Sequence, residues 1–519
     1  MEEKTLQHGL PEAGPQNHAA PKPDQPSSPD VEEGRGAVQL PAQGMLAAQA
    51  IIDSPDNIEE QPLKDLVDKY LKIVQFTDPG FTEDAVDRDI HYAIQEGASA
   101  ADRMISPIHS NISQRMKALA RLRESGSSTC VAAINIGGTT TNTTLAEVTR
   151  EKVTLREVET ASFRKAEEAG RPIECEDHLD YWERTIPAGF IEKLKRILEE
   201  GKEGSTTRFT VEIAVPVPTK DGRIVHMADK AAFKRNPLAP VSEAEARSIT
   251  DPLVYPTIAS SFSEFLESKG ISIDLAKISM GENDTINIIL GQSEIAANLL
   301  GKTNGVGGGV DGTGFNACAF NKEGDGYNFE AGHMRLRTAC KLDDAAHKEA
   351  GMVPSVEGYV SGKILGNVLK AAIRELTPTE GSSLRTFVES MDKDRATALI
   401  FGLTYGTTQE DLSRLNGKET ILLREVCSRF VERAATYLAA VLEGVSRSMG
   451  GDIVFLKEGS VFDKNPEFVK RINEIARREI LVGAPPVHTE NQTGKELDVQ
   501  SLPPSFYGAI YEAAAKAFM

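Results

Sequence analysis

The segment Gly281-Glu-Asn-Asp-Thr285 places an aspartate, Asp284, at the end of a predicted strand (residues 271–280) and at the start of a helix. A carboxylate there lies near a helix N-terminus, where the helix dipole favours negative charge. Such a group can act as general base toward a hydroxyl within hydrogen-bond reach. The alternative is a helix cap, because Asn and Asp are favoured capping residues. Taken alone, the segment leaves both interpretations open.

Two glycine-rich segments could bind phosphate. Residues 135–142, Asn-Ile-Gly-Gly-Thr-Thr-Thr-Asn, follow a strand pattern, and residues 305–317 contain six glycines in thirteen residues. Glycine lets the backbone approach a phosphate closely, and successive N–H groups and Thr hydroxyls can cradle its oxygens. In the second segment Thr313 and Gly314 could cap a phosphate, and Asn316 offers a donor and an acceptor to a hydroxyl-rich ligand. The alternatives are a tight Gly-Gly hairpin for the first segment and a flexible loop for the second.

Two glutamates and a strand-turn complete the candidates. Glu330 stands in Tyr-Asn-Phe-Glu-Ala-Gly-His333, and Glu357 precedes Gly-Tyr-Val-Ser-Gly. Each could equally be a solvated surface charge. The segment 457–461, Lys-Glu-Gly-Ser-Val, follows a buried strand pattern and could form a nucleoside-binding edge.

Composition excludes several classes of function. The 519-residue chain has a net charge of −19, which argues against nucleic acid as a partner because phosphates bind Lys and Arg. Its five cysteines form no CxxC pair, so neither a disulfide framework nor a zinc knuckle is indicated. The N-terminus lacks an apolar signal segment, and no stretch reaches the ~18 apolar residues of a membrane span. We therefore expect a cytoplasmic protein without a membrane partner.

The elements that must position these residues alternate between strands and helices. Strands are predicted at 130–134, 143–148, 152–158 and 207–215, and again at 452–457. The strands at 143–148 and 152–158 are expected to be antiparallel. Helices are predicted at 255–269 and at 421–448, the second ending at Gly450 and Gly451. A mixture of this kind indicates an α/β architecture.

The N-terminal region has a different composition. Residues 1–60 are rich in proline and polar residues, which predicts a disordered tail because too little apolar surface is available to offset the ordering entropy. From Pro62 onward, apolar residues recur at helical spacing, so residues 61–129 are predicted to be a helical entry segment.

In their order along the chain, these segments resemble the motifs of the hexokinases. The resemblance extends from about Leu63 to the C-terminus and rests on six motifs, at 134–139, 283–284, 312–317, 330, 357 and 459–461. It implies a two-lobed actin-like ATPase fold. The entry segment would pack on the large lobe, residues 130–284 would form the small lobe, residues 285–500 the large lobe, and residues 501–519 a C-terminal helix that returns to the small lobe.

The resemblance also implies roles for individual residues. Asp284 would be the catalytic base. The sugar would be held by Asn283, Asn316, Glu330, Glu357, Lys230 and His333. ATP and its phosphates would be bound by Asn135, Gly137, Gly138, Thr139, Thr140, Gly312, Thr313, Gly314, Gly459 and Ser460. Mg²⁺ would enter with ATP rather than through a direct protein site. No zinc is expected, because Cys340 has no partner cysteine.

The chain departs from the family pattern at several positions. The first phosphate motif normally begins with Asp and closes with Arg, and here Asn135 and Asn142 occupy these places. The serine that contacts the sugar is replaced by Ala214, and the tryptophan after the sugar-binding glutamate by Ala331. The run Glu330-Ala-Gly-His333 is similar to that of the bacterial glucokinase and repressor-kinase branch.

The resemblance implies an ATP-dependent kinase that phosphorylates the 6-hydroxyl of glucose or a related hexose. Two alternatives remain open at this point. One is a sugar-binding or regulatory relative with weakened catalysis, suggested by Asn135, Asn142 and Ala214. The other keeps the reaction and changes the substrate to an amino sugar, fructose or mannose. The sequence makes no prediction about oligomeric state.

Overall fold

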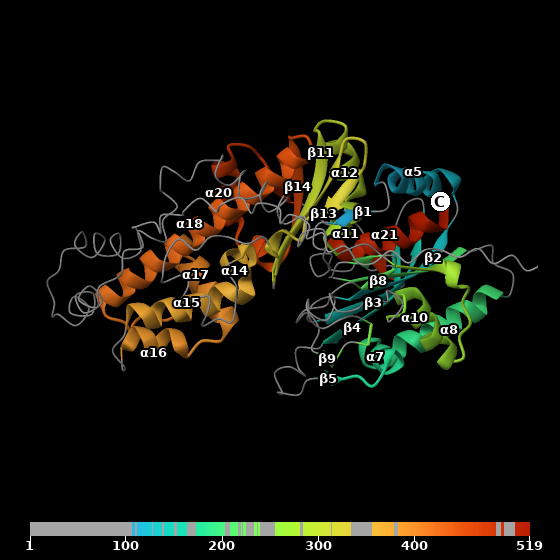
Figure 1. Ribbon diagram of the computed structural model, residues 1–519, viewed down its shortest axis with the longest axis horizontal. Coiled ribbons are helices and arrows are strands. Elements are labelled where there is room, and N and C mark those ends of the chain that lie inside the picture. The colour runs from blue at the N-terminus through green and yellow to red at the C-terminus, as the bar shows by residue number, and fades with distance from the viewer. Residues whose placement is uncertain are drawn as a thin grey trace, which may run out of the picture. The chain divides into compact units, whose positions relative to one another are not determined.

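Two six-stranded mixed sheets organise the chain in the computed structural model (Figure 1). The tail predicted for residues 1–60, and the helices predicted for about 62–105, lie outside the described residues. These are residues 106–108, 112–126, 128–136, 140–149, 153–162, 173–202, 208–215, 219–220, 222–224, 233–235, 237–238, 255–280, 284–312, 314–333, 355–377, 382–483, 489–491 and 504–518.

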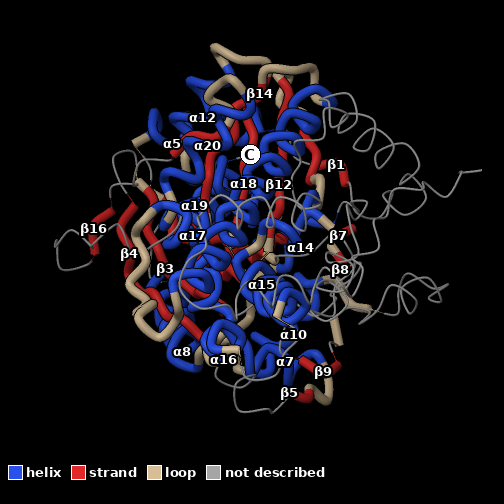
Figure 2. The backbone as a smooth tube through the Cα atoms, turned by 90° about the vertical axis from the view of Figure 1, so that its left-hand side faces the viewer, coloured by secondary structure: helices blue, strands red, loops and turns tan. Residues whose placement is uncertain are grey.

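The sheet built mainly from the first half of the chain has the strand order β10-β6-β2-β3-β4-β16. Strands β2, β3 and β4 form an antiparallel meander, and Figure 2 shows β3 and β4 side by side. Strand β6 lies parallel to both β2 and β10. The bounds are β2 Thr129–Ile136, β3 Thr140–Val148, β4 Val153–Ser162, β6 Arg208–Ala214, β10 Ile278–Met280 and β16 Thr489–Asn491.

These bounds confirm the strands predicted at 130–134, 143–148, 152–158 and 207–215. The strand predicted for residues 271–280 is confirmed only over its last three residues. Asp274 caps a 3₁₀ turn, η2 (Leu275–Lys277), by accepting a hydrogen bond from the Ala276 N–H at 3.0 Å. This local bond competes with strand pairing, which therefore begins only at Ile278.

Both faces of this sheet are covered by helices. Side chains alternate along a strand, and in β2 residues 130, 132 and 134 join a core with α7 (His178–Thr185), α8 (Ala188–Lys202) and α10 (Ile258–Ser268). Residues 131 and 133 face α5 (Ile112–Ser125) and α21 (Pro504–Phe518) instead. All eight residues of β2 are buried as a result. Helix α10 confirms the helix predicted at 255–269.

The other sheet has the strand order β1-β13-β12-β11-β14-β15. Its strands are β1 Ser106–Ile108, β11 Gly305–Asp311, β12 Phe315–Asn321, β13 Gly326–Asn328, β14 Ile453–Glu458 and β15 Leu481–Gly483. Strand β14 confirms the strand predicted at 452–457.

The glycine-rich segment 305–317 is mostly strand rather than a flexible loop. It forms β11, a short turn and the start of the antiparallel strand β12. A Cβ atom on Gly308 would lie 2.6 Å from the Thr285 carbonyl oxygen of α11 (Asp284–Gly291), and one on Gly307 would lie 2.3 Å from the Phe455 ring. The glycines therefore allow neighbouring elements to pack directly against the backbone of β11.

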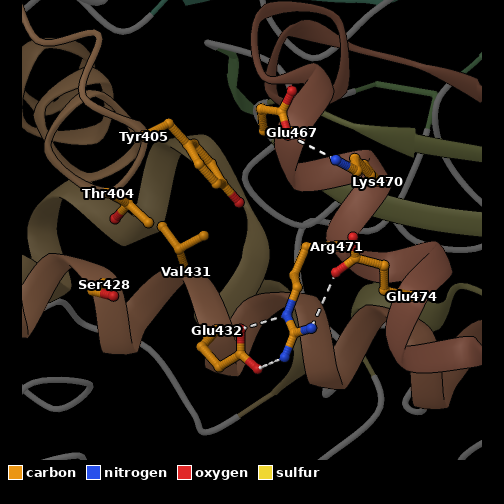
Figure 3. Close-up of a pocket in the computed structure, with 9 residues that line it drawn as sticks. All are labelled: Thr404, Tyr405, Ser428, Val431, Glu432, Glu467, Lys470, Arg471 and Glu474. Carbon is orange, nitrogen blue, oxygen red and sulfur yellow. Dashed lines mark hydrogen bonds and ion pairs between the residues drawn. The ribbon is translucent and has the colours of Figure 1, made fainter.

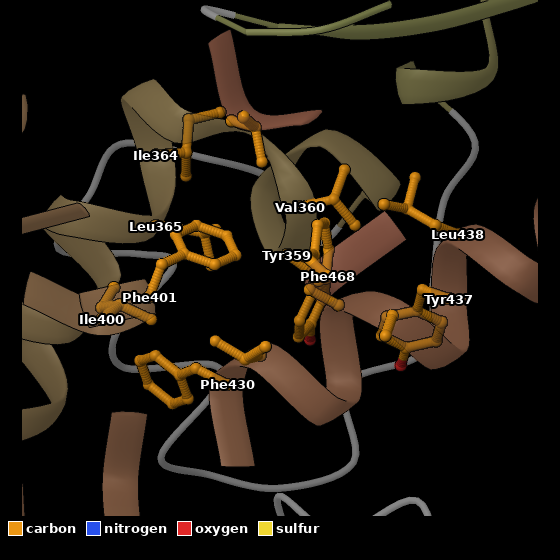
Figure 4. Close-up of a cluster of buried hydrophobic side chains, with 14 of the residues drawn as sticks. Tyr359, Val360, Ile364, Leu365, Ile400, Phe401, Phe430, Tyr437, Leu438 and Phe468 are labelled. Carbon is orange, nitrogen blue, oxygen red and sulfur yellow. The ribbon is translucent and has the colours of Figure 1, made fainter. Parts of the chain in front are cut away.

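Helices also cover both faces of this sheet. One face packs against α11 and α12 (Ser293–Leu300). The opposite face carries the largest core, to which side chains such as Tyr359, Phe401, Phe430 and Phe468 contribute (Figure 4). Helix α18 contains the helix predicted at 421–448, and positive φ angles at Gly450 and Gly451 follow its end. The helices on this face are α14 Val356–Val360, α15 Gly362–Leu376, α16 Ser383–Glu389, α17 Lys393–Tyr405, α18 Gly417–Ser448 and α20 Pro466–Ala476.

The remaining elements are short. Two-residue and three-residue strands form two small pairs, β5 (Ile173–Glu174) with β9 (Phe233–Arg235) and β7 (Thr219–Lys220) with β8 (Arg223–Ile224). A 3₁₀ turn, η3 (Ala331–His333), follows β13, and α19 (Ser460–Lys464) follows β14. Within the described residues, no helix combines the length and apolar character needed to cross a membrane.

Candidate active site

Asp284 is the first residue of α11, directly after the connection from β10. This is the strand-to-helix position predicted from the sequence. Strands β2, β6 and β10 run parallel, so their carboxyl ends meet at one edge of the sheet. Asn135 and Ala214 lie at that edge, as does the chain leading to Asp284. Ligands of open α/β sheets bind at such an edge.

A buried polar cluster joins α11 to the second sheet. The Asn316 side-chain amide donates hydrogen bonds to Thr285 Oγ1 at 3.1 Å and to Asn328 Oδ1 at 2.9 Å. The Asn328 amide donates to Glu330 Oε1 at 2.8 Å. Asn316, Asn328 and Glu330 are at most 8% exposed. The structure thus brings the predicted residues Asn316 and Glu330 together, next to the residue that follows Asp284.

Glu330 has a strained backbone, with φ at +44°. A non-glycine residue in this region costs on the order of 1–3 kcal/mol and persists only where its surroundings enforce it. Here the following residue is held in place, because the Ala331 N–H donates to Asn316 Oδ1 at 3.2 Å. The strain and the hydrogen bonds together fix the direction of the Glu330 carboxylate.

Asn328 is a member of this cluster that the sequence analysis missed. It lies at the end of β13, two residues before Glu330. A spacing of two places side chains on one face of an extended segment. That spacing in Tyr-Asn-Phe-Glu, where Asn328 stands between two aromatic residues, is the signal that could have identified it.

The turn between β11 and β12 is held against α14 and α15. The Gly312 N–H donates to the Gly314 carbonyl oxygen at 3.0 Å, and the Gly362 N–H donates to the Gly312 carbonyl oxygen at 2.8 Å. A Cβ atom on Gly314 would lie 2.8 Å from Glu357 Oε1, and one on Gly312 would lie 3.7 Å from the Ser460 nitrogen. The predicted residues Gly312, Gly314, Glu357 and Ser460 therefore gather around this turn.

Gly459 connects β14 to α19 and lies against the end of β11. Its φ is +111°, and a Cβ atom there would lie 2.3 Å from the Asp311 carbonyl oxygen. Both the backbone conformation and the close approach require glycine. Through this contact the predicted nucleoside edge, Gly459 and Ser460, adjoins the predicted phosphate turn.

Asp311, the residue before this turn, was also missed by the sequence analysis. It is fully buried, and neither side-chain oxygen has a hydrogen-bond partner among the described residues. Burial raises the pKa of Asp311 well above its usual range, and the nearby Glu357 carboxylate raises it further. The sequence signal is a lone acidic residue, in Val-Asp-Gly-Thr-Gly, directly before the glycines of a phosphate-type turn.

Three of the four departures from the family pattern form one row across the first sheet. Asn142 on β3 is opposite Asn135 on β2, which is opposite Ala214 on β6. Asn135 is 8% exposed, and its Oδ1 has no hydrogen-bond partner among the described residues. Asn142 Oδ1 accepts a hydrogen bond from Thr160 Oγ1 at 2.8 Å. The row carries no charged side chain.

Several predicted site residues cannot be assigned to this arrangement. Thr140 begins β3, and His333 ends the turn η3. Asn283, Lys230, Gly137, Gly138, Thr139 and Thr313 lie outside the described residues.

A separate small cavity lies between helices α17, α18 and α20 (Figure 3). Its volume is about 190 Å³, and no predicted site residue lines it. Arg471 donates to Glu432 Oε2 at 2.8 Å and to Glu474 Oε2 at 3.2 Å. Arg471 in the cavity lining is therefore paired with two lining carboxylates.

The side-chain oxygens of the site suit a magnesium ion carried by a nucleotide. Across the described ranges, no group of three or more His, Cys, Asp or Glu side chains could hold a metal ion alone. Mg²⁺, however, usually takes only one or two carboxylates together with substrate phosphates and water. Asp311 and Asn135 both offer buried oxygens without a hydrogen-bond partner in the described structure. Each oxygen is of the kind that such an ion takes as a ligand.

Comparison with known proteins establishes the fold. The chain is similar to a hexokinase crystal structure, with a TM-score of 0.55 and 14% sequence identity over 91% of this chain and 99% of the other. It is also similar to the hexokinase from Schistosoma mansoni complexed with glucose, with a TM-score of 0.52 and 15% identity over 88% of this chain and 100% of the other. No protein-family model and no curated protein sequence matches the chain. The predicted α/β fold, the two-lobed actin-like ATPase fold of hexokinases, is confirmed.

Proposed function

We propose that this protein is a sugar kinase that transfers the γ-phosphate of ATP to the 6-hydroxyl of glucose or a related hexose. The main support for this proposal is the position of residues 284 and 285, between the edge of the first sheet and the buried polar cluster. Asp284 opens α11 at the carboxyl edge of parallel strands, and the next residue, Thr285, accepts a hydrogen bond from Asn316 in the buried polar cluster. A sugar bound by that cluster would have its hydroxyl next to the Asp284 backbone.

The polar cluster has the chemistry that sugar recognition requires. Amide and carboxylate groups of Asn316, Asn328 and Glu330 supply both donors and acceptors in fixed directions. Glu357, beside Gly314, would add a further acceptor, and Asn283, Lys230 and His333 are proposed to complete the sugar site. A site of this kind discriminates strongly between a sugar and an analogue that lacks one hydroxyl, because the analogue leaves buried polar groups unpaired.

In the proposed reaction, Asp284 accepts the proton of the sugar hydroxyl. The hydroxyl oxygen forms a bond to the γ-phosphorus, and the bond between this phosphorus and the β–γ bridging oxygen breaks to release ADP. A positioned general base contributes about 10²–10⁴-fold to the rate. The phosphates would be bound by the turn 312–314, the segment 137–140 and Asn135, with Gly459 and Ser460 at the nucleoside. When bound, Mg²⁺ would neutralise charge on the phosphate oxygens.

The test is a coupled assay with ATP, Mg²⁺ and a panel of hexoses, with phosphorylated products identified by NMR. We expect a hexose 6-phosphate from the wild-type chain, and a kcat lower by about 10²–10⁴-fold for Asp284→Asn. The exposed Asp325→Asn, in the turn between β12 and β13, is the matched control and should retain activity. Full activity in Asp284→Asn would exclude the proposed base.

The uncharged row Asn142, Asn135 and Ala214 favours a second candidate, a sugar-binding regulatory protein with weakened catalysis. Neutral residues at the phosphate edge lower the electrostatic stabilisation of phosphoryl transfer. Calorimetry separates the two candidates. Hexose binding without turnover of any sugar in the panel supports the regulatory protein, whereas hexose-dependent release of ADP supports the kinase.

A further inference from the structure

We propose that Asp311 is the carboxylate that binds the divalent cation of the nucleotide, a role that no sequence motif assigns to it. The inference rests on the proposed use of a Mg²⁺–nucleotide phosphate donor. It concerns a different residue from those that contact the sugar or accept its proton. Three features support this proposal. The Asp311 carboxylate is buried without a hydrogen-bond partner among the described residues, it lies beside the proposed phosphate turn, and the other phosphate segment contains no carboxylate.

The Asp311 carboxylate is buried without a hydrogen-bond partner in the described part of the chain. The nearby charge that acts on it there belongs to another carboxylate, that of Glu357. An isolated buried carboxylate is strongly unfavourable, and buried charges are normally paired or coordinate metals. Negative charges on Asp311 and Glu357 repel each other, and a divalent cation bound to Asp311 would remove both the repulsion and the unpaired charge.

Asp311 lies beside the segments that are proposed to bind the nucleotide. It ends β11 directly before Gly312, the first glycine of the turn proposed to bind phosphate. Gly459, at the proposed nucleoside edge, packs on the Asp311 backbone, and the Ser460 nitrogen lies near Gly312. Asp311 is thus at the junction of the two segments assigned to the phosphate donor.

The first phosphate segment cannot supply a carboxylate. Residues 129–146 contain neither Asp nor Glu, and the polar side chain at the end of β2 is the neutral Asn135. Mg²⁺ at a nucleotide usually takes one or two carboxylates in addition to phosphate oxygens. Asp311 is the carboxylate that directly adjoins a glycine turn of the proposed phosphate site.

The test measures cation binding directly, with the full-length chain, ADP and no sugar. Mn²⁺ replaces Mg²⁺ because its electron paramagnetic resonance signal reports the free ion. We expect Asp311→Asn to weaken Mn²⁺ binding in the presence of ADP by at least ~tenfold, because a ligand costs no less than the outer-shell partners whose loss costs 10–100-fold. Calorimetry in EDTA should show metal-free ADP affinity within about twofold of wild type, since the phosphate contacts assigned to the turn remain. Asp325→Asn, an exposed change of the same kind, should behave as wild type in both measurements.

The outcomes separate this inference from the proposed function. If the wild-type chain binds no ADP with or without Mn²⁺, both are overturned. If ADP binds and Asp311→Asn retains wild-type Mn²⁺ affinity, only the role of Asp311 is overturned. Asp311→Asn keeps the side-chain shape and removes a buried ionisable group, so the fold should tolerate it.

A second measurement uses the unmodified chain and does not depend on how any variant folds. Fe²⁺ replaces Mg²⁺ in the ADP complex, and ascorbate with hydrogen peroxide generates hydroxyl radicals at the bound iron. Backbone cleavage is expected within residues 309–314. Cleavage confined to other segments would overturn the assignment.

Discussion

At the scale of single residues, the proposed sugar site depends on how the side-chain amide of Asn328 is held. Asn328 accepts from the Asn316 amide and donates to Glu330, so it transmits the position of β12 to the proposed sugar-binding carboxylate. The backbone of Glu330 has a strained φ, and a residue keeps such a conformation only where its surroundings enforce it. The hydrogen bond from Asn328 to Glu330 is therefore more important. We therefore propose that Asn328 acts as a positioning residue rather than a catalytic one.

We expect Asn328→Ala to raise the KM for the hexose about tenfold and to leave the KM for ATP unchanged. The change leaves the buried Glu330 carboxylate and the Asn316 amide with fewer partners, which also costs ~1–3 kcal/mol of unfolding free energy. Steady-state kinetics and urea unfolding measure the two effects.

The matched control is Asn298→Ala, an exposed position on α12. It should leave both KM values and the unfolding free energy near those of the wild type. If Asn328→Ala raises the two KM values equally, or alters only stability, Asn328 does not position the sugar-binding carboxylate.

The sequence predicted some of these residues and not others for a physical reason. Asn316, Glu330, Glu357 and the glycines of the turn stand in motifs whose order along the chain is visible. The roles proposed for Asn328 and Asp311 come from interactions between segments: the hydrogen bond of Asn328 with Asn316, and the electrostatic effect of Glu357 on Asp311. Such contacts depend on the register of β11, β12 and β13, which local patterns do not specify.

At the scale of elements, α11 is held by the C-terminal helix α21. These two helices pack backbone to backbone, because a Cβ atom on Gly508 would lie 1.8 Å from the Asn287 carbonyl oxygen. The contact joins helices more than 200 residues apart in the chain. The sequence predicted both helices, but the glycine contact that fixes Asp284 relative to α21 follows only from their packing.

We expect Gly508→Ala to displace α11 and to lower kcat by about 10²-fold, because a misplacement of ~1 Å at a reacting group has this effect. Overpacking should also cost ~1–3 kcal/mol of stability. Kinetics and thermal unfolding measure these changes.

Gly417→Ala is the control for that substitution. Gly417 begins α18, and a Cβ atom there would meet nothing within 4 Å. Alanine at this position should preserve kcat and leave stability equal or slightly increased, by ~0.4–1 kcal/mol. Equal kinetic effects of the two substitutions would contradict a specific role for the α11–α21 contact.

The strands were predicted better than the glycine-rich segment. Residues 130–134 and 207–215 are apolar and β-branched enough to specify buried strands, and they form β2 and β6. The glycines of β11 favour no regular structure by themselves. They become a strand because β12 and β14 pair with them on either side, which is a tertiary effect.

At the scale of the whole molecule, a buried network of charges ties together segments from both ends of the described chain. Lys516 on α21 contacts Glu212 on β6 at 3.1 Å and Glu512 at 3.2 Å. Arg115 on α5 contacts Glu512 at 2.8 Å, and Ser279 on β10 donates to Glu212. Two carboxylates and two cations balance in charge, and they meet beneath the sheet whose edge leads to Asp284.

This network should make stability depend on pH. Burial raises the pKa of Glu212 to about 7, the Glu512 carboxylate adds to the increase, and Lys516 opposes it. Because this value is above the pKa of an unfolded glutamate, about 4.3, the folded state holds more protons between these limits. Its contribution to stability is therefore fully present below about pH 4 and is lost as the pH rises through about 7.

We expect the unfolding free energy of the wild type to contain a component that falls by ~1–3 kcal/mol between about pH 5 and about pH 7.5. Glu212→Gln should remove this component, because glutamine does not titrate, even if it lowers stability at every pH by weakening the contact with Lys516. Glu199→Gln, on the exposed face of α8, is the control and should leave the slope unchanged. Urea unfolding across this range provides the measurement. Parallel curves for Glu212→Gln and the wild type would show that Glu212 does not titrate as a buried group between these pH values.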